Sequence, residues 1–173
     1  MKIKIIGLIT ILCFSISSLY SQEPISKGIY KINQNNYKVE EIYELKSFFI
    51  SNLADTTINE ENPDFLFVDR KLNNSEKLKS KIQEILVKRK GEIKFNNEKI
   101  IIYCNFLLNG KIHSLGYEVN YGSKISLQDF AFIDQYLRKN FIGNISSSHD
   151  LHLELKIIPF IVELELEEKS YSY

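Results

Sequence analysis

Two histidines near the carboxyl end come closest to a metal-binding pattern. His149 and His152 are three residues apart, and Asp150 lies between them. On a helix this spacing could hold zinc together with a third ligand. The segment leads into a predicted strand, however, where residues i and i+3 point to opposite faces. We therefore interpret it as a polar junction and predict no metal site there.

Three further groups carry reactive side chains without a supporting pattern. Cys104 falls on the apolar face of a predicted hairpin, whereas a reactive thiolate needs exposure and a basic neighbour. His113, near the turn of the same hairpin, is expected to be partly covered. Glu163, Glu165 and Glu167 line one strand face. They could ligate calcium, but a solvated face is the simpler interpretation.

Hydrolase motifs do not add to this inventory. The chain has no Gly-x-Ser-x-Gly sequence, and its three histidines leave little choice of a catalytic base. We predict no catalytic, cofactor-binding or metal-binding residues and no cofactor. Whether the protein is an enzyme stays open, and the sequence favours a non-enzymatic role.

The first residues have the layout of a secretory signal peptide. A basic start at Lys2 and Lys4 precedes a nearly unbroken apolar run over 5–16 and a small, polar exit at 17–22. The apolar run is shorter than the about 20 residues that a membrane span requires. We expect cleavage after Ser21, so that 1–21 is a signal peptide and the protein is exported, to the periplasm or the extracellular space. An uncleaved anchor is the alternative.

Charge and cysteine content limit the partners of the mature chain. Loss of Lys2 and Lys4 would leave 20 basic against 22 acidic residues, a net charge of −2. Nucleic acids and anionic lipids prefer a basic face, so neither is expected as a partner, and no stable membrane insertion is expected after cleavage. Cys104 would be the remaining cysteine, which excludes an internal disulfide.

The last hundred residues follow a readable order of elements. Apolar residues at helical spacing predict helices over Ser75–Lys90 and from Ser126 to about Gly143. Ser126 and Asp129 are placed to form a capping box, with Asp in the usual Glu position. Between the two helices, Ile100 to Tyr121 reads as a β-hairpin.

The dipeptide Asn109-Gly110 is typical of a two-residue type I′ turn in this hairpin. Such a turn fixes the register and predicts the following pairs: Leu108 with Lys111, Phe106 with His113, Cys104 with Leu115, Ile102 with Tyr117, and Ile100 with Val119.

The final apolar segment predicts a long strand from Leu151 to Leu166. Its apolar residues move from odd to even positions at Ile158-Pro159, which predicts a β-bulge or kink. Proline belongs at a bulge or on an edge strand, so part of this strand should form a sheet edge. We predict a partner-binding edge that comprises His152, Glu154, Lys156, Ile158, Phe160 and Val162.

The first third is harder to interpret. Gly28 to Asn33 and Phe65 to Val68 suggest short strands, and Val39 to Leu53 suggests a helix. We therefore divide the chain into the signal 1–21, an amino-terminal segment 22–74 of the domain, and a core 75–173.

This order of elements resembles the carboxy-terminal domain of TonB-family energy-transducing proteins, over roughly Leu78 to Leu166. The segments that carry the resemblance are Lys99–Leu115, similar to that family's strand, Gly-containing turn and strand; Leu127–Ile133, at the start of its helix; and Ile157–Phe160, in its closing strand. The resemblance implies an α+β fold with a small antiparallel sheet, made of the hairpin and the closing strand, packed against two helices. It also implies that the closing strand receives a partner peptide.

Departures from the family pattern shape the functional expectation. The family's Tyr-Pro pair before the first helix is absent, and no Pro-rich spacer follows the signal. We expect a free-standing exported relative that acts as a non-enzymatic protein-interaction domain and binds an envelope protein or an extended peptide by strand addition. The alternative is a small exported hydrolase or ligand-binding protein with an unrecognised site.

Overall fold

Alternation of apolar and polar residues builds a six-stranded antiparallel sheet, which dominates the fold. The computed structural model describes residues 24–55, 70–90, 98–147 and 157–166. The strands run in the order β1-β2-β3-β6-β5-β8. Their bounds are β1 Gly28–Ile32, β2 Asn35–Ile42, β3 Ser47–Asn52, β5 Glu98–Leu107, β6 Ile112–Asn120 and β8 Ile157–Leu166.

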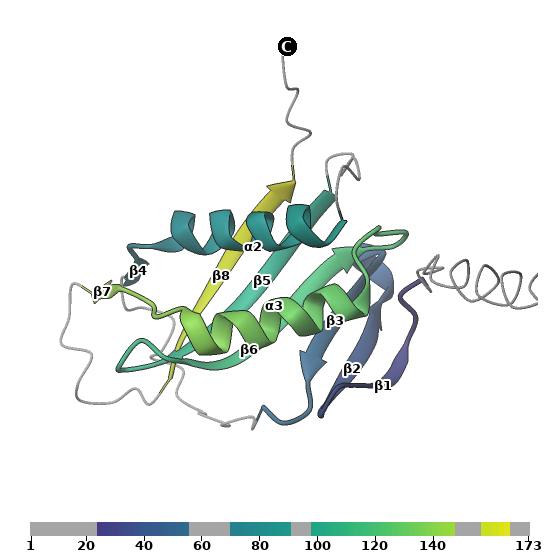
Figure 1. Ribbon diagram of the computed structural model, residues 1–173, viewed down its shortest axis with the longest axis horizontal. Coiled ribbons are helices and arrows are strands. Elements are labelled where there is room, and N and C mark those ends of the chain that lie inside the picture. Colours follow the sequence, from purple (N-terminus) through teal and green to yellow (C-terminus); the bar gives the residue numbers. More distant parts are fainter. Residues whose placement is uncertain (1–23, 56–69, 91–97, 148–156, 167–173) are drawn as a thin grey trace, which may run out of the picture.

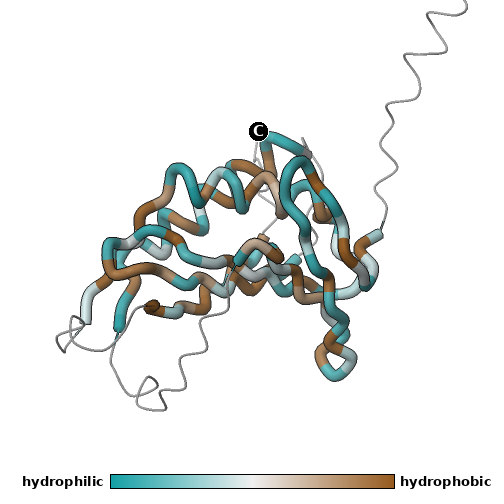
Figure 2. The backbone as a smooth tube through the Cα atoms, turned by 90° about the horizontal axis from the view of Figure 1, so that it is seen from below, coloured by the Kyte–Doolittle hydropathy of each residue, from teal (hydrophilic) through white to brown (hydrophobic). Residues whose placement is uncertain are grey.

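Both α-helices cover the same face of this sheet (Figure 1). They are α2, Ser75–Lys90, and α3, Leu127–Asn140, close to the predicted ranges. Apolar side chains of alternate strand residues fill the space beneath the helices, and in Figure 2 hydrophobic and hydrophilic stretches follow one another along the chain. The opposite face of the sheet mixes polar residues such as Asn105 and Ser114 with the apolar or aromatic Phe49, Tyr103 and Ile161. The α+β class is confirmed, although the sheet has twice the three strands expected.

Helix α3 begins as its sequence predicts. The Ser126 hydroxyl accepts a hydrogen bond from the Asp129 amide (3.3 Å), and the Asp129 carboxylate accepts one from the Ser126 amide (2.9 Å). This reciprocal capping box satisfies two amides that the helix itself leaves unpaired. The buried residues Phe130, Ile133 and Leu137 then form the expected inward stripe.

The amino-terminal segment supplies half of the sheet. Strand β1 agrees with the expectation for Gly28 to Asn33, but the helix predicted over Val39 to Leu53 is wrong. That range holds the end of β2, a 3₁₀ turn η1 at Tyr43–Leu45, and β3. The apolar residues at helical spacing came from two strands and the turn between them; Leu45 and Leu53 of that supposed stripe are exposed. Strand β3 pairs with β6 and so joins this segment to the rest of the sheet.

The β5–β6 hairpin has the predicted register over most of its length and a different turn. Ile100, Ile102 and Cys104 pair as expected, but Phe106 pairs with Ile112 rather than with His113. The connection is a three-residue loop over 108–110. The Gly110 amide donates to the Leu107 carbonyl (2.9 Å).

Only Gly110 in this loop has positive φ (77°), whereas a type I′ turn requires two such residues. The additional loop residue shifts the ladder by one position. A β-bulge at His113 restores the predicted register from Asn105 onward. The predicted pairing of Leu108 with Lys111 does not occur, because Leu108 lies in the loop.

Strand β8 lies at the sheet edge, as the sequence predicts. Its pairing with β5 is continuous from Ile157 opposite Leu107 to Leu166 opposite Glu98. The predicted bulge at Ile158-Pro159 is therefore absent from the described part of the strand. Ile158, Val162 and Leu164 pack toward the helices in one unbroken alternation, and the preceding odd-numbered apolar residues, 151–155, lie outside the described residues.

A clasp of asparagines joins the start of α2 to the chain after α3. Beside it, strands β4 (Arg70–Leu72) and β7 (Ile145–Ser147) form a separate two-stranded sheet. The Asn73 amide donates to the Asn144 carbonyl (2.8 Å), and the Asn144 amide donates to the Asn74 side chain (2.9 Å). The Asn73 side chain approaches the Asn144 side chain (3.5 Å) and donates to Ser146 Oγ (3.2 Å). We call Asn73, Asn74 and Asn144 the asparagine clasp.

Candidate functional site

The residue types with the most reactive side chains do not assemble a catalytic centre within the described ranges. Cys104 is fully buried, and burial raises the pKa of its thiol to about 12, so that it stays protonated at neutral pH. No group of three or more His, Cys, Asp and Glu residues that could hold a metal ion occurs within 24–55, 70–90, 98–147 and 157–166. His149, Asp150, His152 and Glu167 lie outside the described residues.

A buried network of charged and polar groups occupies one end of the sheet under α3. The Asp134 carboxylate, 1% exposed, accepts hydrogen bonds from the Tyr37 hydroxyl (3.1 Å), the Asn52 side chain (3.2 Å) and Arg138 Nε (3.1 Å). Arg138 also pairs with Asp55 (2.7 Å). Burial and the Asp134 charge together raise the pKa of Tyr37.

This network links α3 to β6 and to the segment after β3. Arg138 Nη1 donates to the carbonyl of His113 (3.0 Å), the residue at the β-bulge, and Asp55 accepts from the Leu115 amide (3.1 Å). The bulge thus turns a backbone acceptor toward the guanidinium. Because every charge has a partner inside the protein, we interpret the network as structural.

The outer edge of β8 offers the binding chemistry that remains. The Leu107 amide donates to the carbonyl of Lys111, the residue just before β6 (2.8 Å), so the backbone groups of Leu107 face β6 and those of its neighbour Phe106 face β8. Phe106 is opposite Ile158. Even-numbered residues of β8 therefore bond to β5, and odd-numbered residues direct their backbone groups away from the sheet.

Pro159 agrees with this alternation, since it is odd-numbered and its missing N–H falls on the outer side. Ile161, Glu163 and Glu165 follow it with an amide and a carbonyl each. Within the described part of the chain, no strand pairs with this outer side of β8. We call the outward backbone groups of Pro159, Ile161, Glu163 and Glu165 the β8 edge.

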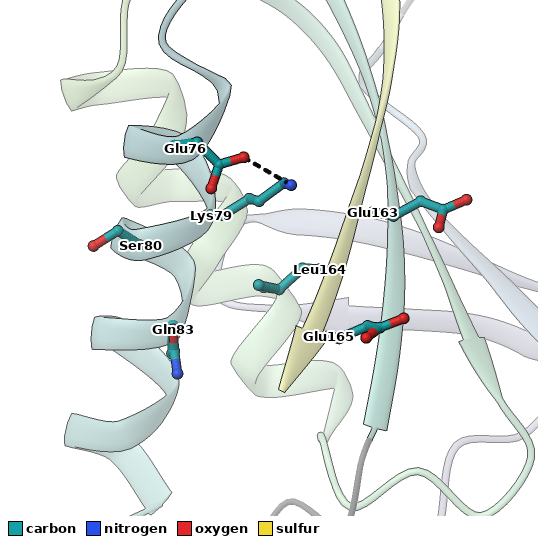
Figure 3. A pocket seen from close by; sticks show the side chains of 7 residues that line it. All are labelled: Glu76, Lys79, Ser80, Gln83, Glu163, Leu164 and Glu165. Atoms are coloured by element: carbon teal, nitrogen blue, oxygen red, sulfur yellow. Dashed lines mark ion pairs between the residues drawn. The ribbon is translucent and has the colours of Figure 1, made fainter. Parts of the chain in front are cut away.

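A groove of about 450 Å³ runs between the β8 edge and α2. Glu76, Lys79, Ser80 and Gln83 line it on the helix side, and Glu163, Leu164 and Glu165 line it on the strand side. Figure 3 shows that Glu76 and Lys79 project from α2 toward the strand. Leu164 points toward the helix, whereas Glu163 and Glu165 point away from it, onto the opposite face of the sheet.

Two ion pairs flank the β8 edge, one on each face of the sheet. Lys79 binds Glu76 on α2 (2.9 Å), and Lys99 of β5 binds Glu163 (2.8 Å). The hydrogen bond to Glu163 raises the pKa of Lys99. Glu165 lies directly opposite Lys99 on β5 and shares that cation with Glu163. Beside Glu163, Ile161 exposes 66% of its surface.

The structure divides the predicted edge residues into two sets. Ile158, Phe160 and Val162 belong to β8, but they bond to β5 and turn their side chains toward the helices; Ile158 and Val162 are buried. His152, Glu154 and Lys156 lie outside the described residues. The residues whose backbone groups face outward are the odd-numbered ones, and of these sequence reasoning assigned Glu163 and Glu165 to a solvated face.

Sequence reasoning also missed the helix wall of the groove. Glu76, Lys79 and Gln83 recur at helical spacing on the polar side of α2, and nothing in that pattern indicates which strand lies beside it. Pro159 indicates an edge strand, but the residues of β8 that face outward follow only once the register with β5 is known.

Comparison with known proteins identifies one shared fold. No family model matches the chain, and no curated protein sequence matches it. A solved structure, that of a DUF5043 family protein from Bacteroides uniformis, matches with a TM-score of 0.58 at 8% sequence identity, over 84% of this chain and 87% of that one. At this identity the match shows a common fold alone. Among the described residues, no helix combines the length and the apolar character needed to span a membrane.

Proposed function

We propose that this protein is an exported, non-enzymatic interaction domain that binds an extended segment of another protein by strand addition at the β8 edge. The observation that carries the proposal is the row of outward backbone groups on Ile161, Glu163 and Glu165, beside a groove of about 450 Å³. An unpaired edge offers a ladder of donors and acceptors to an extended peptide.

The surroundings of the edge favour a partner strand over uncontrolled association. Glu163 and Glu165 are charged residues of the kind that protects natural edge strands from pairing with copies of themselves. Pro159 limits the ladder to the carboxyl-terminal half of β8. The expected signal at 1–21 and the resemblance of 78–166 to TonB-family domains support an envelope or extracellular setting.

A proline scan at one outward position tests the proposal. Ile161→Pro removes an outward amide while sparing the bonds between β8 and β5, so the fold should survive and strand addition should fail. Ile161→Thr is the matched control, because it changes the side chain and keeps the amide. A displayed library of unstructured peptides would be selected on the wild-type protein and then measured on both variants.

Peptides that bind the wild type and Ile161→Thr but not Ile161→Pro would support strand addition. They should also slow hydrogen exchange at the amides of Ile161, Glu163 and Glu165. Peptides that bind all three proteins equally, or that leave these amides unprotected, would show that binding occurs elsewhere.

A further inference from the structure

The chemistry around the β8 edge restricts which extended segment fits it. A strand added beside β8 directs alternate side chains to the two faces of the sheet. One set faces α2 and the groove, and the other lies beside the outward-facing set Ile161, Glu163 and Glu165. The groups that each set of partner side chains would contact indicate which residue types are favoured there.

On the helix side of the groove, charge is already balanced. Glu76 and Lys79 neutralise each other at 2.9 Å, and Ser80 and Gln83 are uncharged. Leu164 adds an apolar floor that is almost fully buried. This side accepts small or polar side chains and gives no selection for charge.

The other face carries one excess negative charge and one exposed apolar side chain. Lys99 binds Glu163 at 2.8 Å and lies directly opposite Glu165 in the register of β5 and β8, so a single cation serves two carboxylates. Ile161 lies four residues earlier on the same face and is largely exposed. Residues directly opposite on neighbouring strands interact, so opposite charges and apolar pairs are favoured there.

We infer that the β8 edge selects an extended segment with a basic residue and an apolar residue four positions apart, opposite Glu165 and Ile161 respectively. This inference rests on the proposed strand addition and adds the chemical class of the partner. A second copy of this chain fits poorly, because its own edge brings acidic residues to an acidic edge. The intervening residues of the partner are small or polar where they face α2.

Synthetic peptides test the charge and the backbone pairing separately. In the probe peptide, every second residue, which would face α2, is threonine. The residues between them, which would lie on the other face of the sheet, include arginine and leucine four positions apart. One control peptide replaces arginine by glutamine, and another keeps the sequence with its pairing amides N-methylated. Affinity would be measured by fluorescence anisotropy at low and high salt.

The arginine peptide should bind about two- to fivefold more tightly than the glutamine peptide, as expected for one cross-strand charge pair. Glu165→Gln should abolish that difference, whereas Glu44→Gln, the same change on the exposed turn η1, should preserve it. Because the pair is exposed, the advantage should fade at high salt.

Each alternative outcome has a distinct meaning. Equal binding of the arginine and glutamine peptides, with protection of the β8 amides, would overturn the charge selection and leave strand addition standing. Undiminished binding of the N-methylated peptide, or no binding of any peptide, would overturn strand addition and this inference with it. Protection of the same amides on raising the protein concentration alone would identify a second copy as the occupant and would also overturn it.

Discussion

Gly110 closely approaches the backbone of Gly143, which makes Gly110→Ala an informative substitution. The residue has a φ of 77°, a region that alanine adopts at a cost of about 1–2 kcal/mol. An added Cβ would also lie 2.3 Å from the carbonyl oxygen of Gly143 and 3.0 Å from Ile142 Cγ2. The first contact is to backbone and is far shorter than any tolerated Cβ–oxygen distance.

Relief of this contact requires the hairpin loop and the chain after α3 to separate. The Gly143 amide donates to the Gly110 carbonyl at 2.8 Å, so that separation strains or breaks a hydrogen bond worth about 0.5–1.5 kcal/mol. Overpacking of this kind typically costs about 1–3 kcal/mol. We expect Gly110→Ala to lower the free energy of unfolding by roughly 3–5 kcal/mol.

Gly122 is the matched control. It has the same φ of 77°, but a Cβ there would meet nothing within 4 Å. Gly122→Ala should therefore cost only the backbone strain of about 1–2 kcal/mol. Urea denaturation of both variants at equal m-value measures the difference. Equal destabilisation of the two proteins would refute the close approach of Gly110 to Gly143, and an unchanged midpoint for Gly110→Ala would also refute the positive φ.

Three further predictions concern buried groups. Cys104 should react with a thiol reagent slowly in the folded protein and rapidly in urea, and equal rates would reopen its interpretation as a nucleophile. Folding raises the pKa of Cys104 from 9.0 to about 12 and also raises that of Tyr37, so the folded state holds more protons and the free energy of unfolding should fall as pH rises above about 9. Denaturation at several alkaline pH values checks the sign, and Cys104→Ala should flatten the dependence. Arg138→Met should cost roughly 3–5 kcal/mol in urea denaturation, because it leaves the buried Asp134 without a cation, and adding Asp134→Leu should recover part of the loss.

The fold was predictable where one element carries its own signal. Helix α3 combines a capping box with an apolar stripe, and both features act within about ten residues of chain. The first third failed because β2, η1 and β3 are short, so apolar residues from different elements coincided with a helical period. Only the pairing of β3 with β6 decides that segment, and this contact is distant in sequence.

Turn chemistry and the edge show a finer limit. Asn109-Gly110 correctly indicated a hairpin and positive φ at Gly110. A two-residue and a three-residue loop differ by a single bulge, however. That bulge lies at His113, whose carbonyl contacts Arg138 of α3, and this contact between distant parts of the chain is not visible in the turn sequence. Likewise, Pro159 indicated an edge. Which residues of β8 face outward depends on the alternation of hydrogen bonds along β5, which the bond from the Leu107 amide to the Lys111 carbonyl fixes. The candidate site was therefore predictable as a strand but not as a set of side chains.

The asparagine clasp bears on how this protein can be produced. Asn73-Asn74-Ser75 and Asn144-Ile145-Ser146 both have the form of an acceptor for N-linked glycans. Folding brings these two sites together, with Asn73 Nδ2 donating to Ser146 Oγ and approaching the Asn144 side chain. A sugar attached to either nitrogen by a eukaryotic secretory host, before this contact forms, would stand where the two segments must meet. Material from such a host should be heterogeneous and less stable than bacterial material, and replacing Ser75 and Ser146 by alanine would remove both acceptors while keeping every asparagine of the clasp.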